Sequence, residues 1–404
     1  MRLPRLTPLK NIAWACLALL VLASGIETGL RIYDYQTGSI TAAETSNFGL
    51  VTPSWTMHHE LKPLHRIKIR RDGQDAVVLG TNSFGVRGNE PQQPKHPDTF
   101  RILCLGDEMV FAKEVANEQS LSGRLQTILG QQTGADIEVI NAGVPGYCPL
   151  LACLQFRREL LALQPDLVIY HFDMTDVDDD RQLRRHVLTD TDDHPKACPH
   201  PSLIREEKLR SNGNLTDHFL TFRFLQQSLL EPLTTGSDSF DLEHQFGKYA
   251  WLADSPPDWS IYIKHAMEPI DQIEHLATSA NSEFILATYP APWQVSATAT
   301  NSAEARRRAG IPQDMKFHSR LPFELLADHA HSKNLKFCDA SSRFDSIADP
   351  DALYLNDAPQ FSAAGHDLYA GVLAEFILKN LNKTIGRRNI ESVPPPRAVL
   401  RFEP

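Results

Sequence analysis

Short, almost continuous apolar runs recur along the chain, and stretches of helical pattern separate them. The apolar runs cover 101–105, 137–143, 165–172, 283–289 and 335–340. The helical stretches cover 117–129, 150–163, 261–280, 321–333 and 363–381. A strand that is apolar at nearly every position is typical of a parallel sheet, because helices cover both of its faces. The alternation therefore predicts an α/β sandwich in which five parallel strands lie between layers of helices, with right-handed crossovers.

Three segments outside this alternation divide the chain further. The first is polar and irregular, with β-like pieces at 65–69 and 76–79. The second is rich in Asp, His and Pro and contains a helical piece near 219–230. The third contains three consecutive prolines, 394–396, and is expected to be a loosely held tail. The predicted parts are a tip and apolar helix at 1–32, an extension at 33–97, an α/β domain at 98–382 with an insertion at about 178–258, and a tail at 383–404.

The N-terminus combines positive charge with a long apolar run. Arg2, Arg5 and Lys10 precede an apolar stretch from Ile12 to Ile26. This order is typical of a signal peptide or a signal anchor. We expect an uncleaved transmembrane helix, with its basic end in the cytoplasm and the bulk of the chain extracytoplasmic or periplasmic. A signal peptide cleaved near Gly25 and a buried helix of a soluble protein are the alternatives.

Composition and charge exclude some classes of protein. The chain of 404 residues is 22% charged and 42% hydrophobic, which is ordinary for a globular protein. Its net charge of -10 argues against a broad nucleic-acid surface, which needs clustered Lys and Arg. The six cysteines form no CxxC pair, so neither a zinc knuckle nor a thioredoxin-type site is expected. A disulfide framework is not indicated, and Cys148 and Cys153 can form a bridge only if the local geometry allows it. Cys104 and Cys338 lie in apolar runs and are expected to be buried thiols.

Polar and glycine-containing segments follow the predicted strands directly. In a doubly wound sheet, ligands bind outside the carboxyl ends of the strands. The segments expected at that edge are 106–108, 142–147, 173–176 and the loop before the last predicted helix. A binding or catalytic site is therefore expected there.

Four ordered segments give the chain a specific resemblance. They read TNSFGVRGNEP…TFRILCLGDEMVFAKEV (Thr81 to Val115), VINAGVPGYCPL, QPDLVIYHFDMTDVDDD and LYLNDAPQFSAAGHDLYAGVLAEFI. In this order and at this spacing they resemble membrane-anchored members of the SGNH/GDSL hydrolase superfamily of esterases. The resemblance covers 81–172 and 283–377. It implies a three-layer α/β/α sandwich of the SGNH hydrolase or flavodoxin-like type.

The resemblance also implies roles for particular residues, and most of these positions are substituted. The nucleophilic serine of active relatives, in Gly-Asp-Ser, is replaced by Glu108. The oxyanion-hole glycine falls on Gly146 and is retained. The asparagine that donates to the oxyanion is replaced by Thr175. The last segment, Asp-x-x-His in relatives, begins with Asp357 but ends in Gln360, so the histidine base is lost.

These substitutions remove groups that acyl transfer requires. A nucleophile needs a neighbouring base of suitable pKa, and the Gln360 amide accepts no proton. Loss of one oxyanion donor costs about 3 kcal/mol of transition-state stabilisation in comparable sites. A Glu108 anion at a helix start, near the Gly146 N–H, is favoured by the helix dipole and repels negative charge that develops on a substrate. The sequence thus predicts loss of the usual hydrolase mechanism.

Other assignments of the reactive groups remain open from sequence. A different register makes Ser120 or Ser362 the nucleophile and His366 the base, although a packing or capping role also explains His366. Cys148 lies two residues after Gly146 and is another candidate nucleophile, although a small buried thiol explains it equally well.

Binding sites of other kinds also remain open. Glu108 with Asp176 or Asp357 can form a carboxylate pair of the kind that glycosidases use. The insertion contains a cluster of acidic, histidine and cysteine residues that can bind a divalent metal or can form a solvated acidic loop. The cluster consists of Asp190, Asp192, Asp193, His194, Cys198 and His200. Four tryptophans can line a sugar-binding groove or can pack in the core or at an interface. They are Trp55, Trp251, Trp259 and Trp293.

Two classes of function follow. The favoured class is a non-catalytic protein that binds a glycan or an acylated ligand, because nucleophile, amide donor and base are lost together. The alternative is an active ester hydrolase, or an O-acyl transferase or deacylase, with a non-standard catalytic set. No cofactor and no metal are expected, and the expected partners are the membrane and such a ligand rather than nucleic acid.

Overall fold

The structure is a computed structural model that describes residues 7–37, 49–69, 76–191, 194–204, 207, 221 and 246–391. It divides into two compact units, Met1–Gly49 with His200–Phe240 and Leu50–Pro199 with Asp241–Pro404. Several predicted features lie outside the described residues: the helical piece near 219–230 except Thr221, the acidic Asp192 and Asp193, and the prolines of the tail.

Helix α1 (Thr7–Thr37) is the longest described element of the first unit. Its section Trp14–Ile32, of 19 residues with a mean hydropathy of 1.7, is only 6% buried. At about 1.5 Å per residue the section measures about 28 Å, close to the thickness of a bilayer core. By length and composition the helix can cross a membrane, and a signal sequence near an N-terminus has the same character. Within the unit Glu27 accepts hydrogen bonds from Arg31 Nε (2.8 Å) and Thr221 Oγ1 (2.9 Å).

The second unit contains a five-stranded parallel sheet with the order β11-β10-β7-β5-β6. Its strands are β5 (Phe100–Gly106), β6 (Ile137–Gly143), β7 (Leu167–Phe172), β10 (Glu283–Thr288) and β11 (Lys336–Asp339). The five predicted strands are confirmed to within two residues at their ends. Because the first strand, β5, lies between β6 and β7, the chain leaves it toward both sides of the sheet. The carboxyl end of β5 is therefore the switch point where doubly wound sheets bind ligands.

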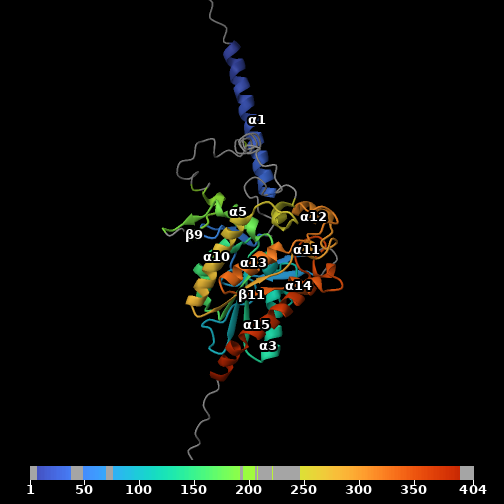
Figure 1. Cartoon of the computed structure of the whole chain (residues 1–404). Helices are drawn as coiled ribbons and strands as arrows, with labels where there is room; N and C mark the ends of the chain where they lie inside the picture. The colour runs from blue at the N-terminus through green and yellow to red at the C-terminus, as the bar shows by residue number, and fades with distance from the viewer. Residues whose placement is uncertain are drawn as a thin grey trace, which may run out of the picture. The chain divides into compact units, whose positions relative to one another are not determined.

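Helices cover both faces of this sheet (Figure 1). One face carries α4 (Pro149–Gln155), α10 (Ser260–Ser279) and α13 (Leu321–Ser332), and the other carries α3 (Leu121–Thr133) and α15 (Ala363–Glu391). Successive residues of β10 alternate between the two cores, with Phe284 and Leu286 in one and Ile285 and Ala287 in the other. The predicted three-layer α/β/α architecture is confirmed.

Two helix boundaries differ from the prediction for identifiable reasons. The predicted helix start at 117 forms a 3-10 turn, and α3 begins only after its N-cap Ser120, whose Oγ accepts from Gly123 N at 3.3 Å. Helix α15 runs to Glu391, beyond the predicted end at 381. No proline occurs between Leu381 and Pro394, and Ile385 is still buried in the core. The first residues of the predicted loose tail are thus helical.

The segment before the sheet is built into the core of the second unit. It forms two antiparallel pairs, β1 (Val51–Pro53) with β2 (His59–Leu61) and β3 (Arg66–Ile69) with β4 (Val77–Gly80). The second pair matches the two predicted β-like pieces. Apolar residues of the segment share a buried cluster with β5 and β7: Leu50, Met57, Leu61, Ile69, Leu79 and Val86. Such short pairs are stable only when packed on a larger core.

Described parts of the insertion also pack on the second unit. They comprise α5 (Asp176–Arg184), β8 (Leu188–Thr189), β9 (Pro195–Ala197) and the 3-10 helix η7 (Gly247–Leu252). Cys198 forms a β-bridge with Met57 of the N-terminal segment. Trp251 Nε1 donates to the Met174 carbonyl at 2.7 Å, which ties η7 to the turn after β7. Both segments therefore help to build the edge at which the site is expected.

Candidate active site

Strand β5 turns sharply into helix α2 (Glu108–Phe111), which begins with the predicted nucleophile position. Asp107 is the N-cap, and its Oδ1 accepts from Met109 N at 3.0 Å. Glu108 is the first helical residue and is half-buried. A Cβ on Gly106 would lie 2.6 Å from Val110 Cγ2, so the turn has no room for a larger residue there. The carboxylate of Glu108 thus stands at a helix N-terminus, as predicted.

The far end of α2 is held by a buried arginine. The Arg87 guanidinium donates to the carbonyls of Phe111, Ala112 and Val115. Burial lowers the pKa of Arg87 to about 10, which leaves it protonated at neutral pH. Asn141 Nδ2 adds a hydrogen bond to the Val110 carbonyl at 2.6 Å. Part of the first resembling segment therefore serves to fix the helix that carries Glu108.

Gly146 lies in a tight turn beyond β6. The turn closes with Tyr147 N donating to the Val144 carbonyl at 3.0 Å, and Val144 N donates to Gly106 O at 3.1 Å. Pro145 at the second position and Gly146 at the third, with φ 78°, are the pattern of a type II turn. No described residue accepts a hydrogen bond from the half-buried Gly146 N–H. That N–H is therefore available to an anion or a carbonyl oxygen.

Thr175 lies in a turn after β7 that carboxylates organise. Thr175 N donates to Asp173 Oδ1 at 2.7 Å, and Asp173 N donates to Asp176 Oδ2 at 2.9 Å. The Tyr170 hydroxyl donates to Asp176 Oδ2, and the Tyr289 hydroxyl to Asp173 Oδ2, both at 2.9 Å. Thr175 itself is half-buried and is the N-cap residue of α5, but its side chain forms no capping hydrogen bond. The position of the amide donor thus carries only a short hydroxyl.

Buried carboxyl groups dominate the electrostatics of this edge. Burial raises the pKa of Asp107, Asp173 and Asp176, and negative charge on neighbouring carboxylates, including Glu108, raises the pKa of Asp107 further. Burial also raises the pKa of Asp179 to about 6, although Lys248 pairs with it. A carboxyl group with a raised pKa is more often protonated, so these shifts mark a buried region in which any further negative charge would be poorly solvated.

The last predicted pair lies in the loop before α15. Asp357 is exposed, whereas Gln360 is half-buried and its carbonyl accepts from Leu355 N at 2.9 Å. The next residue, Phe361, is buried, and its N–H donates to Met109 Sδ at 3.2 Å. This contact joins the loop to helix α2. The segments of Glu108 and Gln360 therefore meet, as do those of Glu108 and Gly146 through the Val144–Gly106 hydrogen bond.

The serines and the histidine of the alternative register cap helices or pack in the core. Ser120 is fully buried and caps α3, and Ser362 Oγ donates to the Ala352 carbonyl and accepts from Gly365 N at the start of α15. The His366 ring is fully buried and meets Phe361 edge-on at 5.6 Å. Burial, with the Arg87 charge, lowers the pKa of His366 to about 3. Each of the three thus has a structural role, in capping or packing, that explains it without catalysis.

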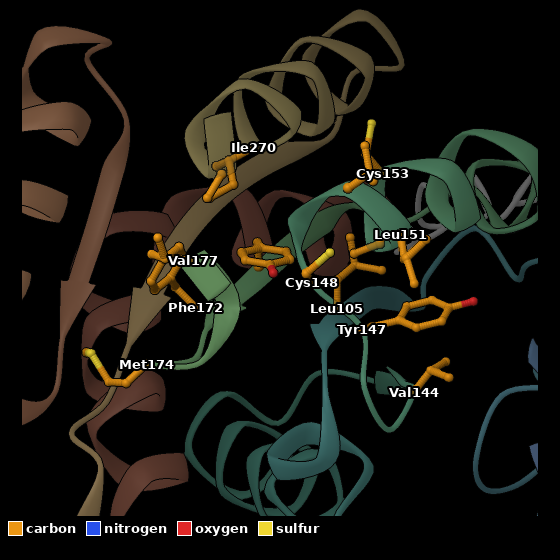
Figure 2. Close-up of a cluster of buried hydrophobic side chains, with 14 of the residues drawn as sticks. Leu105, Val144, Tyr147, Cys148, Leu151, Cys153, Phe172, Met174, Val177 and Ile270 are labelled. Carbon is orange, nitrogen blue, oxygen red and sulfur yellow. The ribbon is translucent and has the colours of Figure 1, made fainter. Parts of the chain in front are cut away.

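Cys148 is also unsuited to nucleophilic attack. Figure 2 shows its sulfur in a cluster of buried side chains that includes Leu105, Leu151 and Val177. Burial raises the pKa of the thiol well above its usual range, and nearby Asp180 raises it further. The thiolate, which is the nucleophilic form, is therefore disfavoured. All six cysteines are free, including the predicted buried pair Cys104 and Cys338.

The sequence also suggested a metal-binding cluster and a groove lined by tryptophans. Among the described residues, which exclude Asp192 and Asp193, no group of three or more His, Cys, Asp and Glu is placed to hold a metal. Of the four tryptophans considered, Trp251, Trp259 and Trp293 are core residues and Trp55 is exposed. A groove of about 870 Å³ lies between α10 and α13, lined in part by Trp259, but none of the five predicted site residues lines it.

Several residues near the site could not be assigned from sequence. Lys248 pairs with Asp179 from a segment that reads as an insertion. His59 reaches the Gly146 turn from the N-terminal segment, where its Nε2 lies 2.8 Å from the Pro145 carbonyl. No spacing or motif marks either residue. Asp173, by contrast, follows a predicted strand directly and belongs to the edge segment that the pattern identified.

Comparison with known proteins yields structural likenesses only. No family model matches the sequence, and no curated protein matches it. A lipase/acylhydrolase from Enterococcus faecalis is similar at 15% identity, over 71% of this chain and 96% of that chain, with a TM-score of 0.37. A GDSL-like lipase from Bacteroides thetaiotaomicron is similar at 13% identity, over 72% and 93%, with a TM-score of 0.35.

A catalytic mutant of an acetylxylan esterase from Geobacillus stearothermophilus is similar at 15% identity, over 69% of this chain and 93% of that chain, with a TM-score of 0.36. All three likenesses are at 15% identity or less and at TM-scores of 0.37 or less. At such identities and scores they say nothing about what this chain binds or does. The assignment of a doubly wound α/β fold rests on the strand order and the two helix layers of the chain itself.

Proposed function

We propose that this chain is a membrane-anchored, extracytoplasmic protein of the SGNH/GDSL hydrolase type that has lost the usual esterase reaction. In this proposal it binds a glycan or an acylated ligand at the carboxyl edge of the sheet. The observation that carries the proposal is Glu108 at the start of α2, where attack would need a hydroxyl. The neighbouring loop offers Gln360, which cannot act as a base.

The charge of the edge supports a neutral ligand. Asp107, Asp173 and Asp176 are buried near Glu108, and their pKa values are raised chiefly by burial. Burial that disfavours ionisation of these carboxyl groups also disfavours a tetrahedral oxyanion at this edge. Carboxyl groups, ionised or protonated, form hydrogen bonds with hydroxyl groups, which a glycan supplies in number. Binding without turnover is therefore the function that the site favours.

Restoring the missing groups tests the proposal. Full-length protein in detergent is assayed for p-nitrophenyl acetate hydrolysis and fluorophosphonate labelling, beside the triple variant Glu108→Ser, Thr175→Asn, Gln360→His. We expect activity and labelling only in the triple variant. The single variant Glu108→Ala, which lacks both carboxylate and hydroxyl, is the matched control and should stay inactive. Turnover by the unmodified protein that a change at one of these positions abolishes would refute the loss of reaction.

One observation favours the alternative, an active hydrolase with a non-standard catalytic set. Asp179 has a pKa raised to about 6 by burial, in the range of a general acid or base near neutral pH, and the charge of Glu108 contributes to that rise. This alternative predicts turnover of p-nitrophenyl acetate by the unmodified protein with an inflection near pH 6. The inflection should vanish in Asp179→Asn and persist in Glu375→Gln, a change at an exposed carboxylate.

The membrane location is tested separately. The apolar section Trp14–Ile32 should keep the full-length chain in the membrane fraction through washes with high salt and carbonate. Release by salt, or recovery of a chain that begins near Gly25, would contradict an uncleaved anchor. A protease that attacks the chain only from the extracytoplasmic side would support the proposed orientation.

A further inference from the structure

His59 packs against the turn that carries Gly146. It lies in β2 and is 6% exposed. Its Nε2 is 2.8 Å from the Pro145 carbonyl oxygen, and its Nδ1 is 2.8 Å from His58 Nδ1. The Tyr147 hydroxyl donates to the His59 carbonyl at 2.9 Å, and the two rings meet edge-on at 5.2 Å. The turn is therefore joined to β2 at two of its residues.

Hydrogen-bond chemistry fixes the role of the His59 ring. A carbonyl oxygen only accepts, so the Nε2 of His59 carries the proton that it donates to Pro145. In the neutral ring Nδ1 is then an acceptor, and it receives the Nδ1 proton of His58. The hydrogen bond to the Pro145 carbonyl thus has one possible direction, from His59 Nε2, and the ring of His58 contacts the other nitrogen of His59.

The hydrogen bond to the Pro145 carbonyl also affects the direction of the Gly146 N–H. The carbonyl of Pro145 and the N–H of Gly146 belong to one planar trans peptide, so the two groups point in opposite directions. A type I and a type II turn differ by a rotation of this central peptide through about 180°. A donor fixed on the Pro145 carbonyl therefore opposes that rotation and holds the Gly146 N–H on the side away from His59.

We propose that His59 is a positioning residue, which keeps the Gly146 N–H aimed at the ligand of the strand-end site by hydrogen bonding to the Pro145 carbonyl. The inference rests on the proposed function, because that proposal makes Gly146 an anion-binding or carbonyl-binding donor. It also gives the N-terminal segment a function. Pairing of His59 with Pro53 in β1, and the hydrogen bond of His58 N to the Cys198 carbonyl, hold the histidines in place.

An isotope-labelling experiment observes this peptide directly. Pro145–Gly146 is the single Pro-Gly step in the sequence. Full-length protein in detergent micelles, labelled with carbonyl-¹³C proline and ¹⁵N glycine, therefore gives one cross-peak in a carbonyl-to-amide correlation spectrum. This peak reports both the Pro145 carbonyl and the Gly146 N–H.

Three substitutions separate donation from packing. In Gln the amide nitrogen lies close to the position of the His Nε2, whereas in Asn it lies near Nδ1 and falls short of Pro145. We expect the peak to shift or broaden in His59→Phe and His59→Asn and to stay near its original position in His59→Gln. His96→Phe, at an exposed histidine, is the matched control. An unmoved peak in both His59→Phe and His59→Asn would overturn the inference, as would an equal shift in His59→Gln.

A kinetic arm uses the triple variant described above. There, His59→Asn should lower kcat for p-nitrophenyl acetate by at least about 10-fold with little change in KM, because the oxyanion donor acts in the transition state. His59→Gln should retain most of the activity. Equal kcat in all three proteins would count against the inference. If the triple variant is inactive, the proposed loss of reaction fails its own test, while the cross-peak still decides the role of His59.

Discussion

The backbone of the strand-end edge and the side chains along it differ in what they retain. The backbone keeps the frame that the proposed hydrolase-type site needs, because α2 starts directly after β5 and no described residue accepts a hydrogen bond from the Gly146 N–H. The side chains at Glu108, Thr175 and Gln360 do not keep its chemistry. Burial and close packing determine the backbone frame, and they do not depend on the reaction. The chemistry depends on a few side chains that are partly exposed. The reaction can thus be lost while the frame persists.

The strongest test of the frame removes its buried arginine. Arg87→Ala leaves the carbonyls of Phe111, Ala112 and Val115 without their donor in a buried place. Such loss of a buried charged donor costs about 4 kcal/mol. Urea unfolding of the full-length protein should show this decrease, and Arg307→Ala, at an arginine whose side chain is 72% exposed, should show almost none. A small effect at Arg87 would mean that α2 is held by other contacts.

The next test concerns close backbone approach. A Cβ on Gly143 would overlap the Phe111 backbone nitrogen, so Gly143→Ala should destabilise the protein by about 3 kcal/mol. Gly130→Ala is the matched control, because Gly130 lies in α3 with open space around its Cβ position. That change should stabilise the protein by up to about 1 kcal/mol. Opposite signs in thermal or urea unfolding would confirm that the frame is fixed by close approach at β6.

A third test concerns the buried His366 ring and the dependence of the unfolding free energy on pH. His366 has a pKa lowered to about 3, so it stays neutral in the folded protein, while it protonates in the unfolded chain below about 6.5. The stability it contributes is complete above pH ~6.5 and is lost as pH falls toward its folded pKa. At pH 5, about 2 kcal/mol should be lost.

His366→Leu should therefore flatten the decrease in unfolding free energy between pH 7 and pH 5. The comparison uses the pH dependence rather than the absolute stability, so changes in packing cancel. His96→Phe should leave the dependence unchanged, because that ring is exposed. An unchanged pH dependence in His366→Leu would show that the buried ring is not the source of acid sensitivity.

The smallest effect is expected within the acidic edge. Burial, with repulsion from Asp173, raises the pKa of Asp176 well above its usual range. A raised carboxyl pKa stabilises the folded state at low pH, and this contribution is lost as pH rises through the folded pKa. Asp176→Asn should then raise the unfolding free energy at pH 7 by about 1 kcal/mol and give no gain near pH 4. A loss at pH 7 would show that the hydrogen bonds from Tyr170 and Asp173 need the charge, and Asp367→Asn, at an exposed carboxylate, is the control.

The fold was largely predictable because its signals are local. Each of the five strands lies in a nearly continuous apolar run, and helices that follow a helical pattern cover both faces of the sheet. Glu108, Gly146 and Thr175 follow three of those strands, so their meeting at one edge follows from parallel topology alone. The predicted end of α15, at 381, was ten residues too early. No proline lies between that position and the observed end at Glu391, and the first proline after it is Pro394.

The N-terminal segment and the insertion were less predictable. Leu50, Met57 and Val86 lie in an irregular sequence, yet all three are core residues. Their burial depends on a surface that other parts of the chain create, and no periodicity records it. The same holds for Lys248, which pairs with Asp179 across 69 residues.

The sequence by itself determined the layered α/β sheet and predicted where the site lies and which of its residues are substituted, because the hydrophobic pattern and the order of the motifs are local properties of the chain. Only the tertiary structure decided which remote groups act on that site. Arg87 holds α2, and the hydrogen bond from His59 to Pro145 spans 86 residues. Hydrogen bonds over such separations depend on the packing of whole elements, and no local pattern encodes them.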